Sequence, residues 1–289
     1  MRNSKLTPVI LLLPLMAVTL TVIIACVNVL LQSIGYVPAF GLTKITLGYY
    51  REVFKRPEFL SALWVSLRIA FVSTLLAAAL GTLLCAALVK RRAGGGMLYT
   101  VRFPILVPHT VVALFIMTLL GQTGIVARAA YGLGLISDYT KFPQILFTPG
   151  YGGAIAGYLW KEIPFVAYYT LALMASVSNT LGEAAENLGA SPLRSFFSVT
   201  LPMSLPAVSK AALIIFIYAF GGYELPALLG STLPKALPVQ AYITYLSPDL
   251  LQRPLAMAMF GVILMLSVLM AALYSIGIRR PIKRLGGEA

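Results

Sequence analysis

Residues 183–202 read EAAENLGASPLRSFFSVTLP and interrupt a chain that is otherwise strongly apolar. The first part, from Glu183 to Leu188, favours a short helix. Gly189 permits a reversal of the chain with positive φ, and Ser191 before Pro192 is typical of an N-cap followed by the first helical residue. The pattern predicts a helix, a turn and a second helix, which is more than a plain loop requires.

The second of these short helices carries an apolar set made of Phe196, Phe197 and Val199. A bare loop beside a membrane would not keep such a set exposed unless another protein covered it. Pro202 then marks the way back into an apolar run. We therefore expect this segment to dock on a partner protein.

The composition is that of an integral membrane protein. Of the 289 residues, 59% are hydrophobic and 11% are charged, whereas an average soluble domain has about 25% charged residues. The formal charge of +13 does not indicate nucleic-acid binding, because Lys and Arg cluster at the ends of apolar runs, as membrane orientation requires. Cys26 and Cys85 each lie inside an apolar run and are interpreted as small hydrophobic residues.

Six stretches reach the length of about 20 apolar residues that a transmembrane helix needs. The sequence therefore predicts an all-α polytopic membrane protein, with residues 1–289 forming a single transmembrane domain. The first stretch follows Arg2 and Lys5, as in a signal peptide, but it is too long for one and is interpreted as a retained helix. The predicted spans are 8–31, 62–89, 101–120, 152–177, 207–229 and 254–278.

The distribution of charge predicts the orientation. The segments on one side of the predicted spans hold twelve of the 22 basic residues and three acidic ones, while the other side holds ten basic and six acidic residues. The positive-inside rule then places both termini and the 183–202 segment in the cytoplasm. The twelve basic residues are Arg2, Lys5, Lys90, Arg91, Arg92, Arg102, Arg194, Lys210, Arg279, Arg280, Lys283 and Arg284.

On the opposite side, apolar residues recur with a helical period between Tyr50 and Leu60, and charged residues fill the other face. This pattern predicts a helix lying on the outer surface. Such a helix could be a docking surface for an external partner, or an interfacial helix that anchors the second span. The sequence leaves both interpretations open.

Ionisable residues inside the predicted spans are candidates for a translocation path, because charges are costly in the membrane and tend to face a cavity or one another. Lys161 and Glu162 precede Pro164, which predicts an irregular, water-lined fourth helix. Glu224 and its neighbour Tyr223 lie between a Gly-Gly pair and Pro226, which predicts an interruption of the fifth helix. An ion pair between the fourth and fifth helices is the structural alternative.

Two further polar residues in the spans are interpreted as structural. Arg68 lies near the outer end of the second span and can extend its guanidinium to the surface. His109 is the chain's single histidine and is interpreted as a hydrogen-bonded helix residue, not as a base or ligand. Catalytic constellations and metal-ligand clusters are absent from the sequence.

The segment beginning Glu183-Ala184-Ala185, with Gly189, Val199 and Leu201-Pro202 at fixed spacing, resembles the EAA loop of the permease subunits of bacterial ABC importers. Only the Val departs from the family's pattern, which has Ile there. The resemblance extends from about Thr46 to Met270. It implies that this loop is a coupling helix seated in a cleft of an ATPase subunit, with docking residues Glu183, Ala184, Ala185, Gly189, Ser191, Pro192, Phe196, Leu201 and Pro202.

Residues 220–259, FGGYELPALLGSTLPKALPVQAYITYLSPDLLQRPLAMAM, resemble the branch that includes spermidine/putrescine permeases and their thiamine, ferric ion and phosphonate relatives. This resemblance, with Glu224, favours a small organic cation such as a polyamine as the substrate. A zwitterion, a neutral solute, or an anion held by Lys161 are the alternatives if Lys161 neutralises Glu224.

The same resemblance implies the partners. The chain has no G-x-x-x-x-G-K-[ST] loop, so ATP and Mg are expected on two cytoplasmic ATPase subunits and the chain is not itself an enzyme. A second permease subunit or second copy, a periplasmic or lipid-anchored binding protein and membrane lipid complete the expected set, in the bacterial inner membrane. An ion-coupled secondary transporter and a purely structural membrane anchor are the rivals from other classes.

Overall fold

The computed structural model describes residues 6–285, which form helices and turns without a named strand. This confirms the predicted all-α class. The chain forms two compact units, one made of Met1–Leu60 with Gln240–Leu266 and the other of Ser61–Val239 with Ser267–Ala289.

The first unit contains α1 (Leu6–Ser33), η1 (Pro38–Phe40), α2 (Gly48–Lys55), η5 (Leu250–Gln252) and the beginning of α13 (Arg253–Leu285). Tyr50 joins three of these helices. Its hydroxyl donates a hydrogen bond of 2.8 Å to Ser33 Oγ, and its ring packs on Gly261, where a Cβ would lie 2.3 Å from the phenol oxygen. Arg253 stacks its guanidinium on the ring of Tyr245, 4.5 Å from the centroid.

The predicted surface helix between Tyr50 and Leu60 is split in two. α2 ends at Lys55 and α3 begins at Pro57. Val53 is fully buried, whereas Phe54 and Leu60 are exposed.

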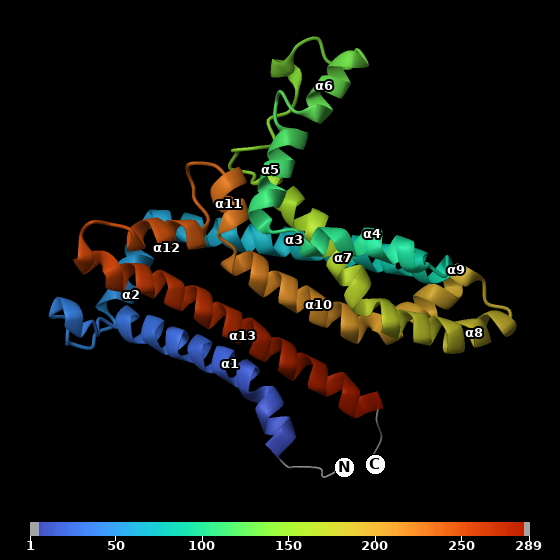
Figure 1. Cartoon of the computed structure of the whole chain (residues 1–289), viewed down its shortest axis with the longest axis horizontal. Helices are drawn as coiled ribbons and strands as arrows, with labels where there is room; N and C mark the ends of the chain where they lie inside the picture. The colour runs from blue at the N-terminus through green and yellow to red at the C-terminus, as the bar shows by residue number, and fades with distance from the viewer. Residues whose placement is uncertain (1–5, 286–289) are drawn as a thin grey trace. The chain divides into compact units, whose positions relative to one another are not determined.

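The second unit is built around one long helix, α7 (Gly152–Val177), as Figure 1 shows. The far end of α5 together with α6, called the α5–α6 extension, projects away from the other helices of this unit, while the beginning of α5 packs on α7 and α11. The remaining elements are α3 (Pro57–Lys90), α4 (Gly95–Leu106), α5 (His109–Leu120), α6 (Ile125–Gly132), η2 (Tyr139–Lys141), η3 (Ser178–Gly182), α8 (Glu183–Asn187), α9 (Pro192–Ser195), η4 (Phe196–Thr200), α10 (Leu201–Gly221) and α11 (Glu224–Leu229). α12 (Leu237–Tyr245) begins in this unit and ends in the first.

The core of this unit lies where α3, α7 and α10 meet. Ala77, Val166 and Ala211 come from these three helices and are fully buried together. Gly81 lets α3 approach α7 closely, since a Cβ there would lie 2.6 Å from Val166 Cβ and 2.7 Å from the Ile163 carbonyl oxygen. A glycine is therefore required at the crossing.

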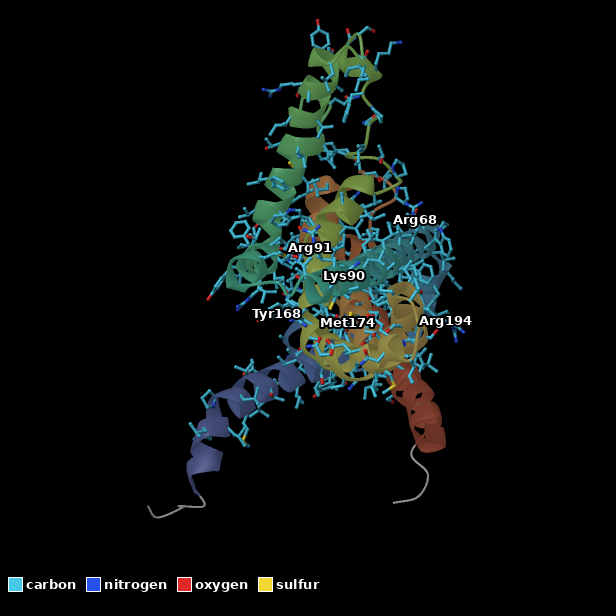
Figure 2. The ribbon with its side chains drawn as sticks, turned by 90° about the vertical axis from the view of Figure 1, so that its right-hand side faces the viewer. Arg68, Lys90, Arg91, Tyr168, Met174 and Arg194 are labelled. Carbon is cyan, nitrogen blue, oxygen red and sulfur yellow. The ribbon has the colours of Figure 1, made fainter. Side chains whose placement is uncertain are left out.

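A second cluster packs the other end of α7 and contains Met174, which is fully buried among the helices. Figure 2 places Met174 inside the group of helices and Arg194 at its edge. Lys90 ends α3, and Arg91 follows it in the same view.

Five segments within residues 6–285 are long and apolar enough to cross a membrane: Leu11–Ser33, Pro57–Lys90, His109–Gly132, Pro192–Gly221 and Leu250–Gly277. α7 has sufficient length and matches the predicted bounds 152–177, but it is not among the five. It carries Lys161, Glu162 and three tyrosines. A sixth span, through α7, therefore stays a prediction.

Two of the expected helices differ in the structure. The predicted span 101–120 is not one continuous helix, because α4 ends at Leu106 and α5 begins at His109. Pro108 explains the break: it lacks an N–H, and it disfavours helical geometry at Val107, whose ψ is 130°. The prediction of an irregular fourth helix is wrong, since α7 is continuous through Pro164.

Candidate functional site

The 183–202 segment forms two short helices joined by a tight turn, as the sequence predicts. Gly189 has a φ of +94°, and its N–H donates to the Glu186 carbonyl at 2.9 Å while the Ala190 N–H donates to Ala185 at 3.1 Å. Ser191 then caps α9, its hydroxyl accepting a bond of 3.3 Å from the Arg194 N–H. These bonds satisfy the free groups at both helix ends.

The segment is tied to the long helices at its base. The buried Ser195 hydroxyl donates to the Gly182 carbonyl at 3.0 Å, so the end of α9 is joined to the start of α8. A Cβ on Gly182 would lie 3.2 Å from Thr200 Oγ1, so the ends of η3 and η4 approach closely there. Leu201 and Pro202 lead directly into α10. Arg92 and Glu183 also approach to 3.9 Å, but both are exposed and the pair contributes little.

The exposed apolar surface of the segment consists of Leu188, Leu193 and Phe197, which are 90%, 72% and 57% exposed. The sequence-based set of Phe196, Phe197 and Val199 is therefore partly wrong. Phe196 is half-buried and packs on the cluster that contains Met174. The cause is η4, a turn of π-helix from Phe196 to Thr200 that changes which side chains face outward.

The predicted path residues Lys161 and Glu162 lie together in the middle of α7, and both side chains are buried. The Lys161 ammonium donates to the Val107 carbonyl at 2.5 Å, at the break between α4 and α5. Its Nζ also lies 3.5 Å from Nδ1 of His109. Lys161 is thus turned toward a backbone carbonyl and an imidazole.

Tyr223 and Glu224 lie at the second break, as the sequence predicts. α10 ends at Gly221, Gly222 is extended, and Glu224 begins α11. Both side chains are exposed. The ion pair considered between the fourth and fifth helices is not formed, since no salt bridge within residues 6–285 joins Lys161 to Glu224.

His109 has a larger role in the structure than its sequence context indicates. Its Nδ1 lies 3.1 Å from the Tyr218 hydroxyl of α10, and the two rings are 5.1 Å apart. The histidine is hydrogen-bonded, as expected, but it connects Lys161 with Tyr218. Pro108 is the sequence signal for this position, because a proline disfavours helical geometry at the residue before it and so places His109 at the start of the next helix.

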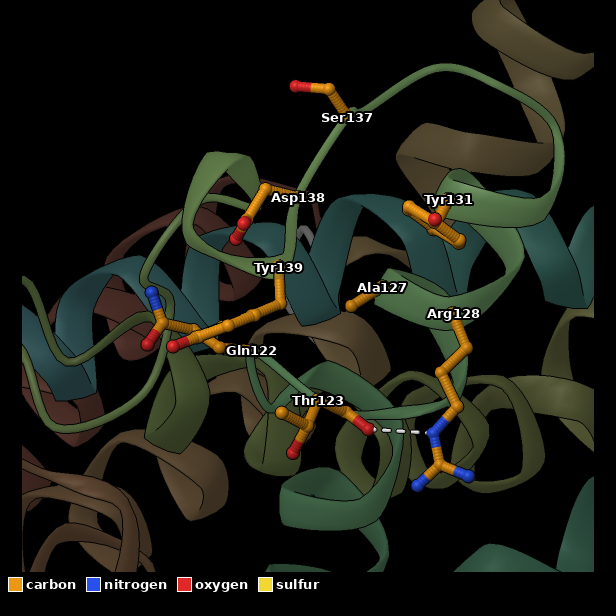
Figure 3. A pocket seen from close by; sticks show the side chains of 8 residues that line it. All are labelled: Gln122, Thr123, Ala127, Arg128, Tyr131, Ser137, Asp138 and Tyr139. Carbon is orange, nitrogen blue, oxygen red and sulfur yellow. Dashed lines mark hydrogen bonds between the residues drawn. The ribbon is translucent and has the colours of Figure 1, made fainter.

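Arg68 has the structural role expected of it, and its guanidinium donates to the Pro149 carbonyl. A separate hollow of about 400 Å³ lies in the α5–α6 extension and shares no residue with the sites above. Its wall is stabilised by the bond of 2.8 Å from Arg128 Nε to the Thr123 carbonyl (Figure 3). The lining residues are Gln122, Thr123, Ala127, Arg128, Tyr131, Ser137, Asp138 and Tyr139.

These features define a helical membrane protein with an exposed apolar segment at 183–202 and a polar cluster at two helix breaks. The family model described as "Binding-protein-dependent transport system inner membrane component" matches residues 77–280. The chain belongs to this family of transporter subunits.

Curated relatives share the family but differ in what they transport. The molybdenum transport system permease protein ModB of Azotobacter vinelandii is 24% identical over 178 residues, covering 61% of this chain and 75% of the relative. The putrescine permease protein PotI of Escherichia coli K12 is 26% identical, covering 58% and 55%. The trehalose permease protein SugA of Mycobacterium tuberculosis is 30% identical, covering 61% and 56%. The chain thus spans about half the length of the last two, and the polyamine branch is one of several.

Solved structures share the fold. A bacterial alginate ABC transporter, in complex with a periplasmic protein bound to an alginate pentasaccharide, contains a chain with a TM-score of 0.74 at 19% identity, covering 96% of this chain and 98% of that one. The inward-facing MetNI methionine ABC transporter gives a TM-score of 0.52 at 20% identity, covering 79% and 96%.

Proposed function

We propose that this chain is the permease subunit of a bacterial ABC importer, which lines the translocation path and couples it to ATP hydrolysis by a separate subunit. The observation that carries this proposal is the 183–202 segment. It exposes Leu188, Leu193 and Phe197 on a segment that lies between α7 and α10 in the chain and that the bond from Ser195 to Gly182 closes at its base. Exposed apolar side chains on such a base suit contact with a partner protein whose movements are transmitted to the membrane helices.

The complex would contain two cytoplasmic ATPase subunits that bind ATP and Mg, a second permease subunit or copy, and an external binding protein. Family membership and the likeness to a transporter complexed with a periplasmic protein support this composition. In this arrangement residues 1–289 act as one transmembrane domain with both termini in the cytoplasm. The chain transmits force and makes or breaks no covalent bond of the substrate.

The substrate we favour is a small organic cation such as a polyamine. The Glu224 carboxylate is exposed at a helix break, and within the described residues no hydrogen bond or ion pair engages it. Lys161 is held by the Val107 carbonyl, which leaves the carboxylate charge available to a cation. The likeness to PotI supports the choice. Molybdate, sugars, thiamine, ferric ion and phosphonates are the alternatives to exclude.

The experiment is reconstitution of the complex in proteoliposomes, with candidate ATPase and binding-protein subunits from the same organism. The importer predicts uptake only when the ATPase, ATP and the liganded binding protein are all present. A secondary transporter would instead take up solute along an ion gradient without ATP. A structural anchor would give no uptake under either condition. A ligand screen on the binding protein identifies the substrate independently.

A further inference from the structure

Two helices of the second unit are broken, and both breaks lie against the same face of α7. The first break, at Val107 and Pro108, separates α4 from α5. The second, at Gly222, separates α10 from α11. Tyr158 and Lys161 are three residues apart on α7 and therefore share a face.

Lys161 stabilises the first break. The Val107 carbonyl belongs to an extended residue at the end of α4, and Lys161 supplies its hydrogen bond at 2.5 Å. An unpaired carbonyl in the membrane interior is costly, and a cation at a helix C-terminus interacts favourably with the helix dipole. A buried lysine that makes this bond has a structural reason for its charge that needs no substrate.

Tyr158 stabilises the second break. Its side chain is almost completely buried, and a Cβ on Gly222 would lie 2.0 Å from its hydroxyl oxygen. The tyrosine therefore fills the space that the extended glycine leaves between α10 and α11. Only a residue without a side chain allows this packing.

His109 connects the two breaks. It begins α5, and its Nδ1 faces the Lys161 ammonium at 3.5 Å and the Tyr218 hydroxyl at 3.1 Å. An ammonium has no acceptor, so the Nδ1 that faces it must carry the lone pair. Tyr218 can then donate to this nitrogen, which joins α5 to α10 one turn before Gly222.

We infer that Lys161 is a positioning residue which, through the Val107 carbonyl and the His109–Tyr218 hydrogen bond, makes the breaks in α4–α5 and α10–α11 move as one hinge. Lys161 does not contact substrate in this arrangement. The inference rests on the proposed transport function only for its consequence, which is that the two breaks change together during the transport cycle. Its structural part concerns this chain alone.

The structural part can be tested without partners, by hydrogen exchange on the full chain in lipid nanodiscs. Lys161→Met removes the bond to Val107, so amide exchange in a peptide covering 105–113 should accelerate by about tenfold or more. Lys161→Arg retains a donor, so exchange in this variant should stay as slow as in the wild type. Tyr218→Phe should accelerate exchange in the same peptide. Tyr169→Phe, on an exposed side chain of α7, is the control and should have no effect.

The functional part is tested by ATP-driven uptake with the same variants. Lys161→Met and Tyr218→Phe should each lower the rate by about tenfold, and the double variant should be no slower than the slower single one, because both act through one network. Lys161→Arg should restore transport. The inference would be overturned if the two substitutions lowered the uptake rate multiplicatively in the double variant. It would also be overturned if Lys161→Arg behaved like Lys161→Met in exchange or in uptake. Wild-type protein without ATP-dependent uptake would instead contradict the proposed function, and the exchange result would still stand.

If Lys161→Met does not fold, its exchange and uptake rates do not report on the hinge. Tyr218→Phe, which deletes one oxygen atom, then provides the test. If it changes neither exchange at 105–113 nor uptake, the two breaks are not joined through His109.

Discussion

The Ser195 hydroxyl donates a hydrogen bond of 3.0 Å to the carbonyl of Gly182, thirteen residues earlier in the chain. This bond holds the two short helices of the 183–202 segment at a fixed distance. The position of the exposed set Leu188, Leu193 and Phe197 relative to α7 and α10 depends on it. Under the proposed function, removing this bond should weaken coupling without changing the exposed set itself.

Ser195→Ala removes this donor, and the loss of the hydrogen bond costs about 0.5–1.5 kcal/mol. We expect the chain to insert normally and the binding-protein-stimulated ATPase activity of the complex to fall. Ser198→Ala, at an exposed position of the same segment, is the matched control. Equal stimulation in both variants would show that the bond does not position the segment.

Gly189→Ala tests the turn between α8 and α9. A Cβ there meets nothing within 4 Å, so the only penalty is the positive φ of +94°, about 1–2 kcal/mol. Uptake and stimulated ATP hydrolysis should fall together while expression persists. Gly94→Ala is the control, because Gly94 is also exposed and unobstructed but has a φ of −76°. Loss of function in both would indicate an effect unrelated to the backbone geometry.

The orientation is tested with single cysteines in a Cys26→Ser, Cys85→Ala background, using a thiol reagent that cannot cross the membrane. Ser137 and Ser191 are both exposed. Ser137→Cys should react in intact cells, whereas Ser191→Cys should react only after lysis. Reaction of Ser191→Cys in intact cells would place the docking segment outside and exclude an ATPase partner there.

Gly222→Ala should damage the α10–α11 break, because its Cβ would overlap the Tyr158 hydroxyl. Overpacking of this kind costs about 1–3 kcal/mol. Adding Tyr158→Phe removes the overlapping oxygen, so the double variant should recover part of the lost thermal stability in detergent. A double variant less stable than Gly222→Ala alone would contradict the packing described here.

Glu224→Gln keeps the shape of the side chain and removes its charge. If the substrate is a cation, the uptake rate should fall by about tenfold, since a partly solvated ion pair contributes on the order of 1–4 kcal/mol. Basal ATP hydrolysis should remain. Glu186→Gln, an acid of the docking segment, controls for the loss of one negative charge. Undiminished cation uptake by Glu224→Gln would favour another substrate class.

Local sequence signals predicted much of this structure. The bounds of α7, the helix-turn-helix at 183–202 and the break before Glu224 follow from apolar length, Gly189 and the Gly-Gly pair with Pro226. Each depends on a few neighbouring residues, whose backbone preferences act in the same way in any context.

Other features depended on packing between distant residues. The run 101–120 is mostly apolar, and at its break Lys161, 54 residues after Val107, supplies a hydrogen bond to the Val107 carbonyl. The orientation of Phe196 depends on a π-helical turn that composition does not reveal. The partners of His109 lie on α7 and α10, far away in the sequence, so its immediate neighbours could not identify them.

The close crossing of α3 and α7 at Gly81 limits how these helices can slide. Val166 and the Ile163 carbonyl leave no room for even one additional carbon atom, so a shift along the axis would drive a neighbouring side chain of α3 into this contact. The two helices are therefore interlocked at this crossing. Domain motions divide into hinge and shear types, and this crossing favours rotation of the pair as a rigid lever over shear between its members.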